Sequence, residues 1–355
     1  MAGIALLFVA AGVAVSTLVS LFNQRVDSVS LLLATVIVGF AGLLLFTSTK
    51  LGKTDQASIF TAVGTTWLIV SLFGTIPYLL AGTFIRTGIG IPEVFVDSLF
   101  ESVSGFTASG STVFGAHNPI EMQGSGILFY RQLTQWMGGM GIVILVVSVL
   151  PSLRASGLGL IDAEAPGAGV ERIAPRVVET AKKFWYVYLS LTVFIALALF
   201  LFGMGPFDAV SHALTTASTG GFSTKDSSLG HWNSIKIEMV VMLGFLLAAI
   251  NFTLHARSIE KKRFNYASDS EFKSFMGLIA VGVLIITLLL NLEGFSFGTA
   301  LRNASFNVVT LATSGGYGNA LGRGESGDFA SWPGSTQLLL LFFIVIGGCT
   351  GSTSG

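Results

Sequence analysis

The sequence predicts an all-α membrane protein made of repeated units, each a helix, a re-entrant loop and a second helix, with two extra transmembrane helices in front. Composition is the first observation behind this prediction. Of the 355 residues, 52% are hydrophobic and only 11% are charged, so the chain cannot cover itself with a charged, water-facing surface. The second observation is a series of long apolar stretches, and the third is a glycine-containing segment that occurs three times between them.

Eight apolar stretches are predicted to be transmembrane helices, because each approaches the length needed to cross a bilayer. They cover residues 2–22, 29–47, 57–84, 126–150, 184–204, 237–253, 275–292 and 336–348. The first lacks a basic flank and is too long for a cleavable signal, so we interpret it as a helix of the mature chain. The predicted organisation is two accessory helices (1–50), a first repeat (51–155), a second repeat (156–262) and an incomplete third repeat (263–355).

The three repeats align on one glycine each: Gly110, Gly221 and Gly316. Polar residues recur nine and thirteen positions before these glycines, namely Glu101 and Asp97, His212 and Asp208, and Asn307 and Asn303. Each segment lies between two apolar stretches but is too short and too polar to cross a bilayer itself. We therefore predict three re-entrant loops, each a half-helix followed by an extended return.

Main-chain oxygens of these loops are the predicted ion-binding groups. Glycine and hydroxyl residues are poor helix formers, and extended backbone inside a membrane can aim its carbonyl oxygens at a shared axis, where they replace the water around an alkali cation. The half-helix dipole favours a cation at its carboxyl end. The predicted potassium ligands, around a central ion pore, are the main-chain oxygens of Thr107, Ala108, Ser109, Gly110, Ser218, Thr219, Gly220, Gly221, Thr313, Ser314, Gly315 and Gly316. These segments contain no carboxylate, which argues against a divalent ion.

Other polar residues are interpreted as structural. Glu101 and His212 are predicted to hydrogen-bond neighbouring backbone and so hold their loops, with direct contact to the ion as the alternative. Arg131, near the outer end of the fourth stretch, is interpreted as an interfacial anchor. The basic cluster at 257–263 is either a solvated face beside the membrane or a docking surface for a cytosolic partner or anionic lipid. Residues 151–180 are predicted to be a partly ordered cytoplasmic connector.

Several classes of function are disfavoured. The net charge is zero, so nothing indicates a nucleic-acid partner. The single cysteine, Cys349, excludes a disulfide within the chain, and the four histidines have no metal-binding spacing. We find no catalytic motif in a plausible context, so the chain is predicted not to be an enzyme.

Basic residues predict the orientation in the membrane. With a cytoplasmic N-terminus, twelve lysines and arginines fall in inner segments and seven in outer segments. Because positive residues are enriched on the cytoplasmic side, this orientation is favoured, and the loops enter the membrane from outside.

Several separated motifs resemble the Trk/Ktr/HKT potassium transporter superfamily, in the order found there. They are residues 100–107, 135–141, 212–224, 307–317 and 347–353. The resemblance covers essentially the whole chain, and the two leading helices resemble the bacterial TrkH type. It implies potassium uptake through a pseudo-fourfold pore of four repeats, with Gly110, Gly221 and Gly316 as filter glycines. In HKT relatives a serine at the first of these positions accompanies sodium preference, so Gly110 implies potassium.

The resemblance also implies a gate and partners. The gate would be an intramembrane loop under the filter, formed here by Gly347, Gly348, Cys349, Gly351, Ser352 and Thr353. Relatives of this type lie in the bacterial inner membrane among lipid, form homodimers and bind a cytosolic ring of nucleotide-binding regulatory subunits. The chain departs from the pattern at Ser109, Ser111 and Gly315, and the fourth repeat is absent from it. We expect that repeat to follow Gly355.

Alternative functions make different predictions. A secondary transporter of a small solute would have inverted repeats and some charges inside its spans, whereas these repeats run in the same direction and the spans are nearly free of charge. A relative that passes both sodium and potassium would share the filter. A membrane scaffold without transport would need no repeated filter segments.

Overall fold

The computed structural model describes residues 1–23, 27–48, 56–86, 88, 90–139, 141, 170–263 and 266–354. Over these ranges the regular structure is helical, apart from one isolated bridge between Gly115 and Asn118. The predicted all-α class is therefore confirmed. The chain divides into two compact units, which we describe separately. Unit 1 contains Met1–Phe106 and Gln123–Tyr186, and unit 2 contains Thr107–Met122 and Val187–Gly355.

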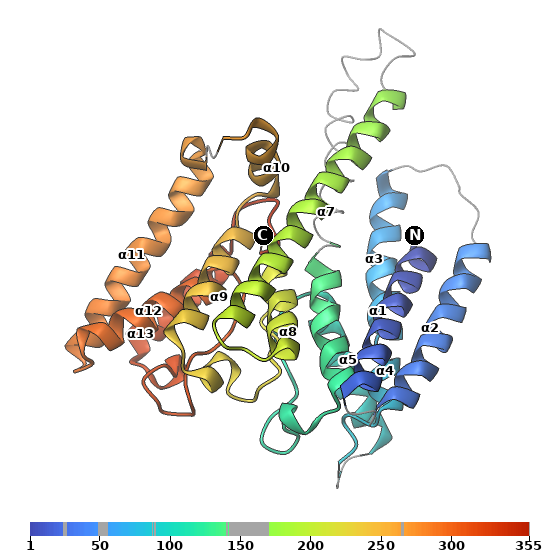
Figure 1. The fold of residues 1–355 in the computed structure, drawn as a ribbon, viewed down its shortest axis with the longest axis horizontal. Coiled ribbons are helices and arrows are strands. Elements are labelled where there is room, and N and C mark those ends of the chain that lie inside the picture. Colours follow the sequence, from blue (N-terminus) through green and yellow to red (C-terminus); the bar gives the residue numbers. More distant parts are fainter. Residues whose placement is uncertain are drawn as a thin grey trace. The chain divides into compact units, whose positions relative to one another are not determined.

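Unit 1 is a group of mostly long, apolar helices. Its elements are α1 (Ala2–Asn23), α2 (Ser28–Ser48), α3 (Gln56–Phe73), α4 (Ile76–Leu80), α5 (Ile91–Phe106), a helix over residues 125–139 and the first part of α7 (Val170–Leu201). α1 and α2 lie side by side (Figure 1). A side chain at Gly3 would overlap the backbone of Phe46, so a small residue permits this close approach.

The turn between α1 and α2 holds the start of the helix over 125–139. The carboxylate of Asp27 accepts hydrogen bonds from Ser20 Oγ and from the N–H of Ile127, the latter at 2.6 Å. The first N–H groups of a helix have no partner within it, and its amino end favours negative charge. The buried carboxylate of Asp27 therefore ties the accessory helices to the second helix of the first repeat.

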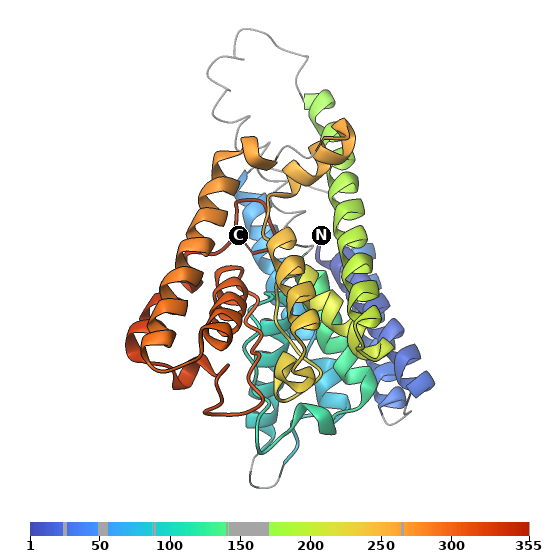
Figure 2. The same ribbon diagram turned by 60° about the vertical axis from the view of Figure 1, so that its left-hand side comes forward.

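Unit 2 contains the rest of α7 and the helices of the second and third repeats. They are α8 (Pro206–Ala217), α9 (Ile235–Ala248), α10 (Phe252–Lys261), α11 (Ser270–Leu292), α12 (Phe297–Ala312) and α13 (Gly334–Ile346), with 3-10 turns at Ile120–Met122, Ser228–Trp232, Tyr266–Ser268 and Phe329–Ser331. α12 contacts α9, α11 and α13 (Figure 2). Asp269 and Ser296 cap the starts of α11 and α12, because each side chain accepts a backbone N–H of the first turn.

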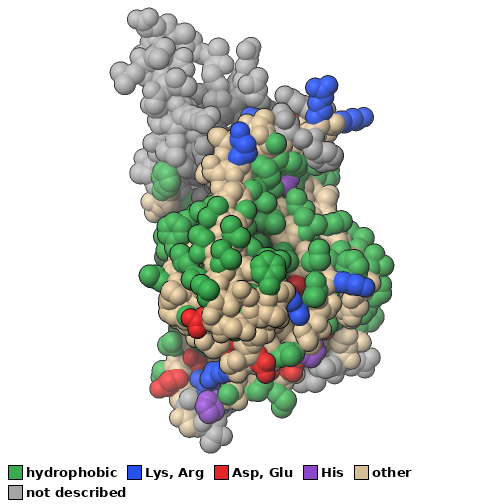
Figure 3. All heavy atoms as spheres, turned by 90° about the vertical axis from the view of Figure 1, so that its left-hand side faces the viewer, with side chains coloured by type: hydrophobic (Ala, Val, Ile, Leu, Met, Phe, Trp, Pro, Cys, Tyr) green, Lys and Arg blue, Asp and Glu red, His purple; other side chains and the backbone are tan. Residues whose placement is uncertain are grey.

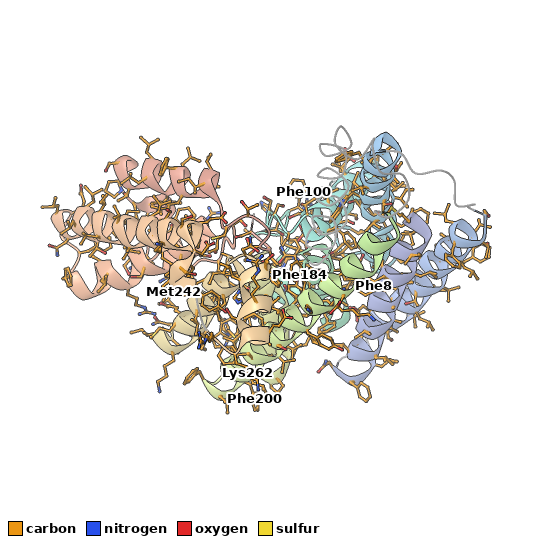
Figure 4. The ribbon with its side chains drawn as sticks, turned by 90° about the horizontal axis from the view of Figure 1, so that it is seen from above. Phe8, Phe100, Phe184, Phe200, Met242 and Lys262 are labelled. Atoms are coloured by element: carbon orange, nitrogen blue, oxygen red, sulfur yellow. The ribbon has the colours of Figure 1, made fainter. Side chains whose placement is uncertain are left out.

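Within the described residues, five helices are long and apolar enough to cross a membrane: Ala2–Asn23, Ser28–Ser48, Phe60–Leu80, Glu179–Leu201 and Ser270–Leu292. On the face that contains α11, hydrophobic side chains form a broad band (Figure 3). Leu284 in α11 is 58% exposed, and Phe200, which projects outward near the end of α7 (Figure 4), is 51% exposed. An apolar exterior of this extent is stable against lipid and not against water.

Most predicted spans match helices of the structure. The stretches 2–22, 29–47 and 275–292 correspond to α1, α2 and α11, and 336–348 corresponds to the shorter α13. The stretch 57–84 is interrupted between α3 and α4, and the part of 126–150 beyond 139, apart from residue 141, lies outside the described residues. α7 begins at Val170, well before the predicted 184, so the last part of the expected connector is helical, whereas residues 151–169 are not described.

The prediction of one continuous helix over 237–253 is wrong. α9 ends at Ala248, α10 begins at Phe252, and the two helices meet at 90°. Asn251 stabilises the break, because its side chain accepts the N–H of Thr253 at 2.8 Å and so caps α10. The sequence contains neither glycine nor proline here, which is why the apolar pattern indicated a straight span.

Candidate functional site

Two of the re-entrant helices, α8 and α12, are short helices with buried polar residues. α8 has 12 residues and α12 has 16, fewer than a spanning helix needs. Each ends in a tight turn that its own backbone stabilises: Gly220 N–H donates to Thr215 O at 2.8 Å, and Gly315 N–H donates to Thr310 O at 2.7 Å. These turns end the helices and start residues 218–221 and 313–316, which together with residues 107–110 are the predicted filter segments.

All three filter segments share one backbone conformation. The filter glycine and the residue two positions before it have positive φ in each repeat: Ala108 (52°) and Gly110 (75°), Thr219 (53°) and Gly221 (79°), and Ser314 (57°) and Gly316 (71°). Positive φ is uncommon for residues other than glycine. Three similar deviations at matching positions therefore indicate a shared structural requirement, and alternating the sign of φ turns successive carbonyl groups toward one side.

The three segments lie next to one another within unit 2. A methyl group added at Gly110 would overlap the carbonyl oxygen of Gly220, and one added at Gly221 would overlap the carbonyl oxygen of Gly315. Each of these glycines therefore faces a main-chain oxygen of the following loop, and only glycine permits so close an approach. Gly316 has no described atom within 4 Å of the corresponding position.

The polar residues upstream of the second filter glycine hold the return segment. His212 is fully buried, with Nδ1 2.8 Å from Asp208 O and Nε2 2.9 Å from Ser223 Oγ. Thr224 Oγ1 donates to the Asp208 carboxylate at 2.6 Å. The prediction that His212 hydrogen-bonds neighbouring backbone and holds its loop is confirmed.

The third loop is held at the same positions by amides. Asn307 Nδ2 donates to Asn319 Oδ1 at 3.2 Å, and Asn319 Nδ2 donates to Asn303 Oδ1 at 3.1 Å. All three side chains are buried. The Asn303–Asn319 bond joins residues 16 apart in sequence, as the Asp208–Thr224 bond does in the second repeat.

In the first repeat, the corresponding residue forms an ion pair. Arg131 Nε donates to Glu101 Oε1 at 2.6 Å, and the two side chains are 1% and 0% exposed. Arg131 is therefore not the interfacial anchor that its position near a span end indicated; it is the counter-charge of Glu101 inside unit 1. Burying either charge alone would be costly, which explains why the two residues meet.

The predicted gate residues form a loop at the end of α13. Gly347 and Gly351 adopt φ of 67° and 72°, which ends the helix and turns the chain. Thr353 Oγ1 lies 3.2 Å from Ala217 O, at the carboxyl end of α8, and 3.4 Å from Thr219 Oγ1 in the second filter segment. The loop is thus adjacent to the filter within unit 2.

The same loop is attached to the break between α9 and α10. Thr353 N–H donates to Ala248 O at 3.2 Å, Cys349 N–H donates to Ala249 O at 2.9 Å, and Gly351 O accepts the N–H of Phe252 at 3.1 Å. A broken helix leaves carbonyl groups at one end and N–H groups at the other without helical partners. The loop supplies partners to both ends, so its position depends on the bend.

Sequence reasoning assigned no role to three residues of this site. Asn251 forms the bend, Tyr317 inserts its hydroxyl between elements of the second repeat, and Glu271 accepts the N–H of Thr350 at 2.7 Å. Only Asn251 carried a local signal, since it is an amide at the end of an apolar stretch and asparagine favours helix starts. Among the described residues, no three His, Cys, Asp or Glu side chains are grouped to bind a metal ion.

Comparison with known proteins agrees with this geometry. The family model described as "TrkH: Cation transport protein" matches residues 30–355. A Trk system potassium uptake protein TrkH from Halomonas elongata is 39% identical over 293 residues, and one from Escherichia coli K12 is 36% identical over 295 residues. Each alignment covers 81% of this chain and 57% of the relative, so the chain spans little more than half the length of these relatives.

A solved structure shows the same fold. The crystal structure of the potassium transporter TrkH from Vibrio parahaemolyticus has a TM-score of 0.83 and 32% identity, and the match covers 99% of this chain and 70% of that one. These matches and the apolar helices identify a multi-pass membrane protein with pore-loop architecture. Since the matched family is one of transport proteins, the prediction that the chain is not an enzyme is confirmed. The chain belongs to the TrkH family of cation transport proteins.

Proposed function

We propose that this chain provides three of the four loops of a potassium-selective pore and takes part in potassium uptake across the bacterial inner membrane. Potassium ions would pass down their electrochemical gradient and would be coordinated mainly by the main-chain oxygens of residues 107–110, 218–221 and 313–316. Rings of carbonyl groups replace the hydration shell of an alkali cation without a carboxylate.

One observation carries this proposal: the three filter segments share their pattern of positive φ and lie edge to edge. Unrelated packing demands would not give the same uncommon conformation at Ala108, Thr219 and Ser314. The carboxyl ends of α8 and α12 lie at the start of their segments and add a negative potential that favours a cation.

The same geometry supports positions for a fourth loop and for a gate. Gly110 and Gly221 each face a carbonyl group of the next loop, so we place a fourth loop beside Gly316, where no described atom lies within 4 Å. The loop from Gly347 to Thr353 would gate the pore, because it lies against Ala217 and Thr219. From the distribution of basic residues we place the N-terminus in the cytoplasm, with lipid around the apolar helices. From the family resemblance we add a second copy of the protein and a cytosolic nucleotide-binding regulatory subunit.

The test is uptake by cells that lack their own potassium uptake systems. We expect the protein as its gene encodes it to restore growth on limiting potassium and to take up rubidium. Gly110→Ser would displace the carbonyl oxygen of Gly220, which a side chain there overlaps. By the resemblance to HKT relatives, we expect the uptake that remains to favour sodium over potassium.

Gly115→Ser is the matched control. Gly115 lies in the segment that follows the same filter, and a side chain there would meet nothing within 4 Å. It should leave uptake and ion preference unchanged. Absence of potassium and rubidium uptake by the native protein, with its regulatory subunit present, would overturn the proposal.

A further inference from the structure

The side chain that follows the third filter glycine reaches into the second repeat. Tyr317 comes directly after Gly316 and is fully buried. Its ring packs against His212 and Phe245, with ring centroids 5.6 and 5.3 Å away. All of these residues belong to unit 2, and both neighbours come from the second repeat.

The hydroxyl group of Tyr317 joins the second loop at three points. It is hydrogen-bonded to Thr215 Oγ1 on α8, and it lies 3.4 Å from both His212 O and Phe222 O. Phe222 directly follows the second filter glycine, Gly221. One hydroxyl therefore connects the third filter segment to the helix before the second segment and to the backbone after it.

The backbone at this position is held as well. Tyr317 N–H donates to Thr310 Oγ1 on α12 at 2.9 Å. The residue is thus attached to its own half-helix through the main chain and to the neighbouring repeat through the side chain. The corresponding residue of the first repeat, Ser111, is exposed, so this side-chain position is not a general requirement of the loops.

We propose that Tyr317 is a positioning residue for ion selectivity, setting the separation between the second and third filter segments through its hydroxyl group. Selectivity between potassium and sodium depends on the geometry and number of the carbonyl groups around the ion. A residue that fixes one loop against the next controls that geometry without touching the ion. This inference rests on the proposed function and adds to it the residue that holds two adjacent walls of the filter.

The test compares ion preference in two variants that remove opposite ends of the hydrogen bond. Tyr317→Phe keeps the ring and removes its hydroxyl, and Thr215→Val removes the partner with little change in shape. In cells that lack their own potassium uptake, we expect each variant to lower the ratio of rubidium to sodium uptake by about fivefold, the size of one net hydrogen bond. The double variant should lose no more than either single variant, because both changes remove the same contact.

Tyr266→Phe is the matched control. The hydroxyl group of Tyr266 is hydrogen-bonded to His255 Nδ1 at 3.0 Å, outside the filter segments. Removing this hydroxyl group should leave the ratio of rubidium to sodium uptake unchanged. Native ion preference in both filter variants would overturn the proposal. So would equal loss of rubidium and sodium uptake, or loss of the folded protein as judged by size-exclusion chromatography, because either result gives the hydroxyl a purely structural role. Failure of the proposed function itself would be visible separately, as absence of rubidium uptake by the native protein.

Discussion

The second and third repeats reach the same filter backbone with different side chains. In the second, a histidine and a carboxylate bond to hydroxyl groups of the return segment. In the third, three asparagines bond to one another at matching positions. Yet Thr219 and Ser314 have φ of 53° and 57°, and the filter glycines two positions later, Gly221 and Gly316, have φ of 79° and 71°. The requirement is a buried polar partner at a given place, and its chemical identity is free to vary.

The first repeat extends this comparison to charge. Its residue nine positions before the glycine, Glu101, is paired with Arg131 on the following helix. An ion pair inside a protein is worth little compared with apolar residues of the same size, but losing one partner is expensive. The first repeat should therefore be the most sensitive to removal of a single polar side chain.

Adding a methyl group at Gly221 should have the largest effect on ion uptake. Gly221→Ala places a side chain on the carbonyl oxygen of Gly315 and forces alanine into a left-handed conformation. The overlap alone typically costs about 1–3 kcal/mol and the conformation about 1–2 kcal/mol more. We expect rubidium uptake to fall below detection while the protein still reaches the membrane. Gly203→Ala is the control, because it has φ of 105° and no neighbour within 4 Å, and so carries strain without overlap.

The same substitution at Gly316 sharpens the comparison. The described neighbours of Gly316 leave open space, so they alone would give Gly316→Ala only the effect of Gly203→Ala. A fourth loop in that space would make Gly316→Ala as harmful to uptake as Gly221→Ala, and this is the result we expect. Uptake by Gly316→Ala equal to that of Gly203→Ala would exclude a close carbonyl group there.

Removing the carboxylate of Glu101 in the first repeat should have the largest effect on thermal stability. Glu101→Gln leaves Arg131 buried without its counter-charge, and such a change costs about 3–5 kcal/mol. Thermal unfolding of the purified protein in detergent should show a markedly lower midpoint. Glu238→Gln is a matched control, because Glu238 also pairs with an arginine at 2.6 Å, but Arg302 is 29% exposed and keeps access to solvent. Equal destabilisation by both variants would contradict the special cost of the buried pair.

The parts of this site that could be predicted from sequence are those with a local cause. The glycines of the predicted filter were identifiable because left-handed φ and close approach both select glycine, at Gly110 and Gly221 alike. The positive φ of Ala108, Thr219 and Ser314 could not be predicted, because nothing in those residue types favours it. It is imposed by the end of each half-helix and by the neighbouring loops.

Partners distant in sequence account for the remaining differences between the predictions and the structure. The position of Arg131 near a span end indicated the membrane interface. Its partner, Glu101, lies 30 residues away, and apolar periodicity does not indicate such pairs. The hydroxyl of Tyr317 reaches residues about a hundred positions earlier. At the 90° bend beside Asn251, the open helix ends find their hydrogen-bond partners in the loop after α13, which is distant in sequence. Apolar patterning predicted which segments cross the membrane and not where tertiary contacts break them.

Removing the central amide of the third repeat should have a moderate effect. Asn319→Ala breaks two side-chain hydrogen bonds and leaves the amides of Asn303 and Asn307 buried with fewer partners. A buried polar group without its partner costs about 1–3 kcal/mol, so we expect the detergent unfolding midpoint to fall less than in Glu101→Gln. Asn23→Ala is the control, since its side chain is exposed and donates to Val19 O within its own helix, α1. A midpoint for Asn319→Ala equal to that control would show that the amides do not hold the loop.

The smallest effect is expected at the contact between the loop after α13 and the carboxyl ends of α8 and α9. Thr353 Oγ1 lies 3.0 Å from Ala248 O at the end of α9 and 3.2 Å from Ala217 O. Thr353→Val keeps the shape and removes one hydroxyl, worth about 1 kcal/mol. If this contact holds the loop closed, rubidium uptake without the regulatory subunit should rise about two- to fivefold. Thr336→Val is the control, because Thr336 is buried in α13, the helix before the loop, but bonds locally to Pro333 O. A decrease in uptake by Thr353→Val would contradict this expectation, because it would mean that the contact stabilises the open pore.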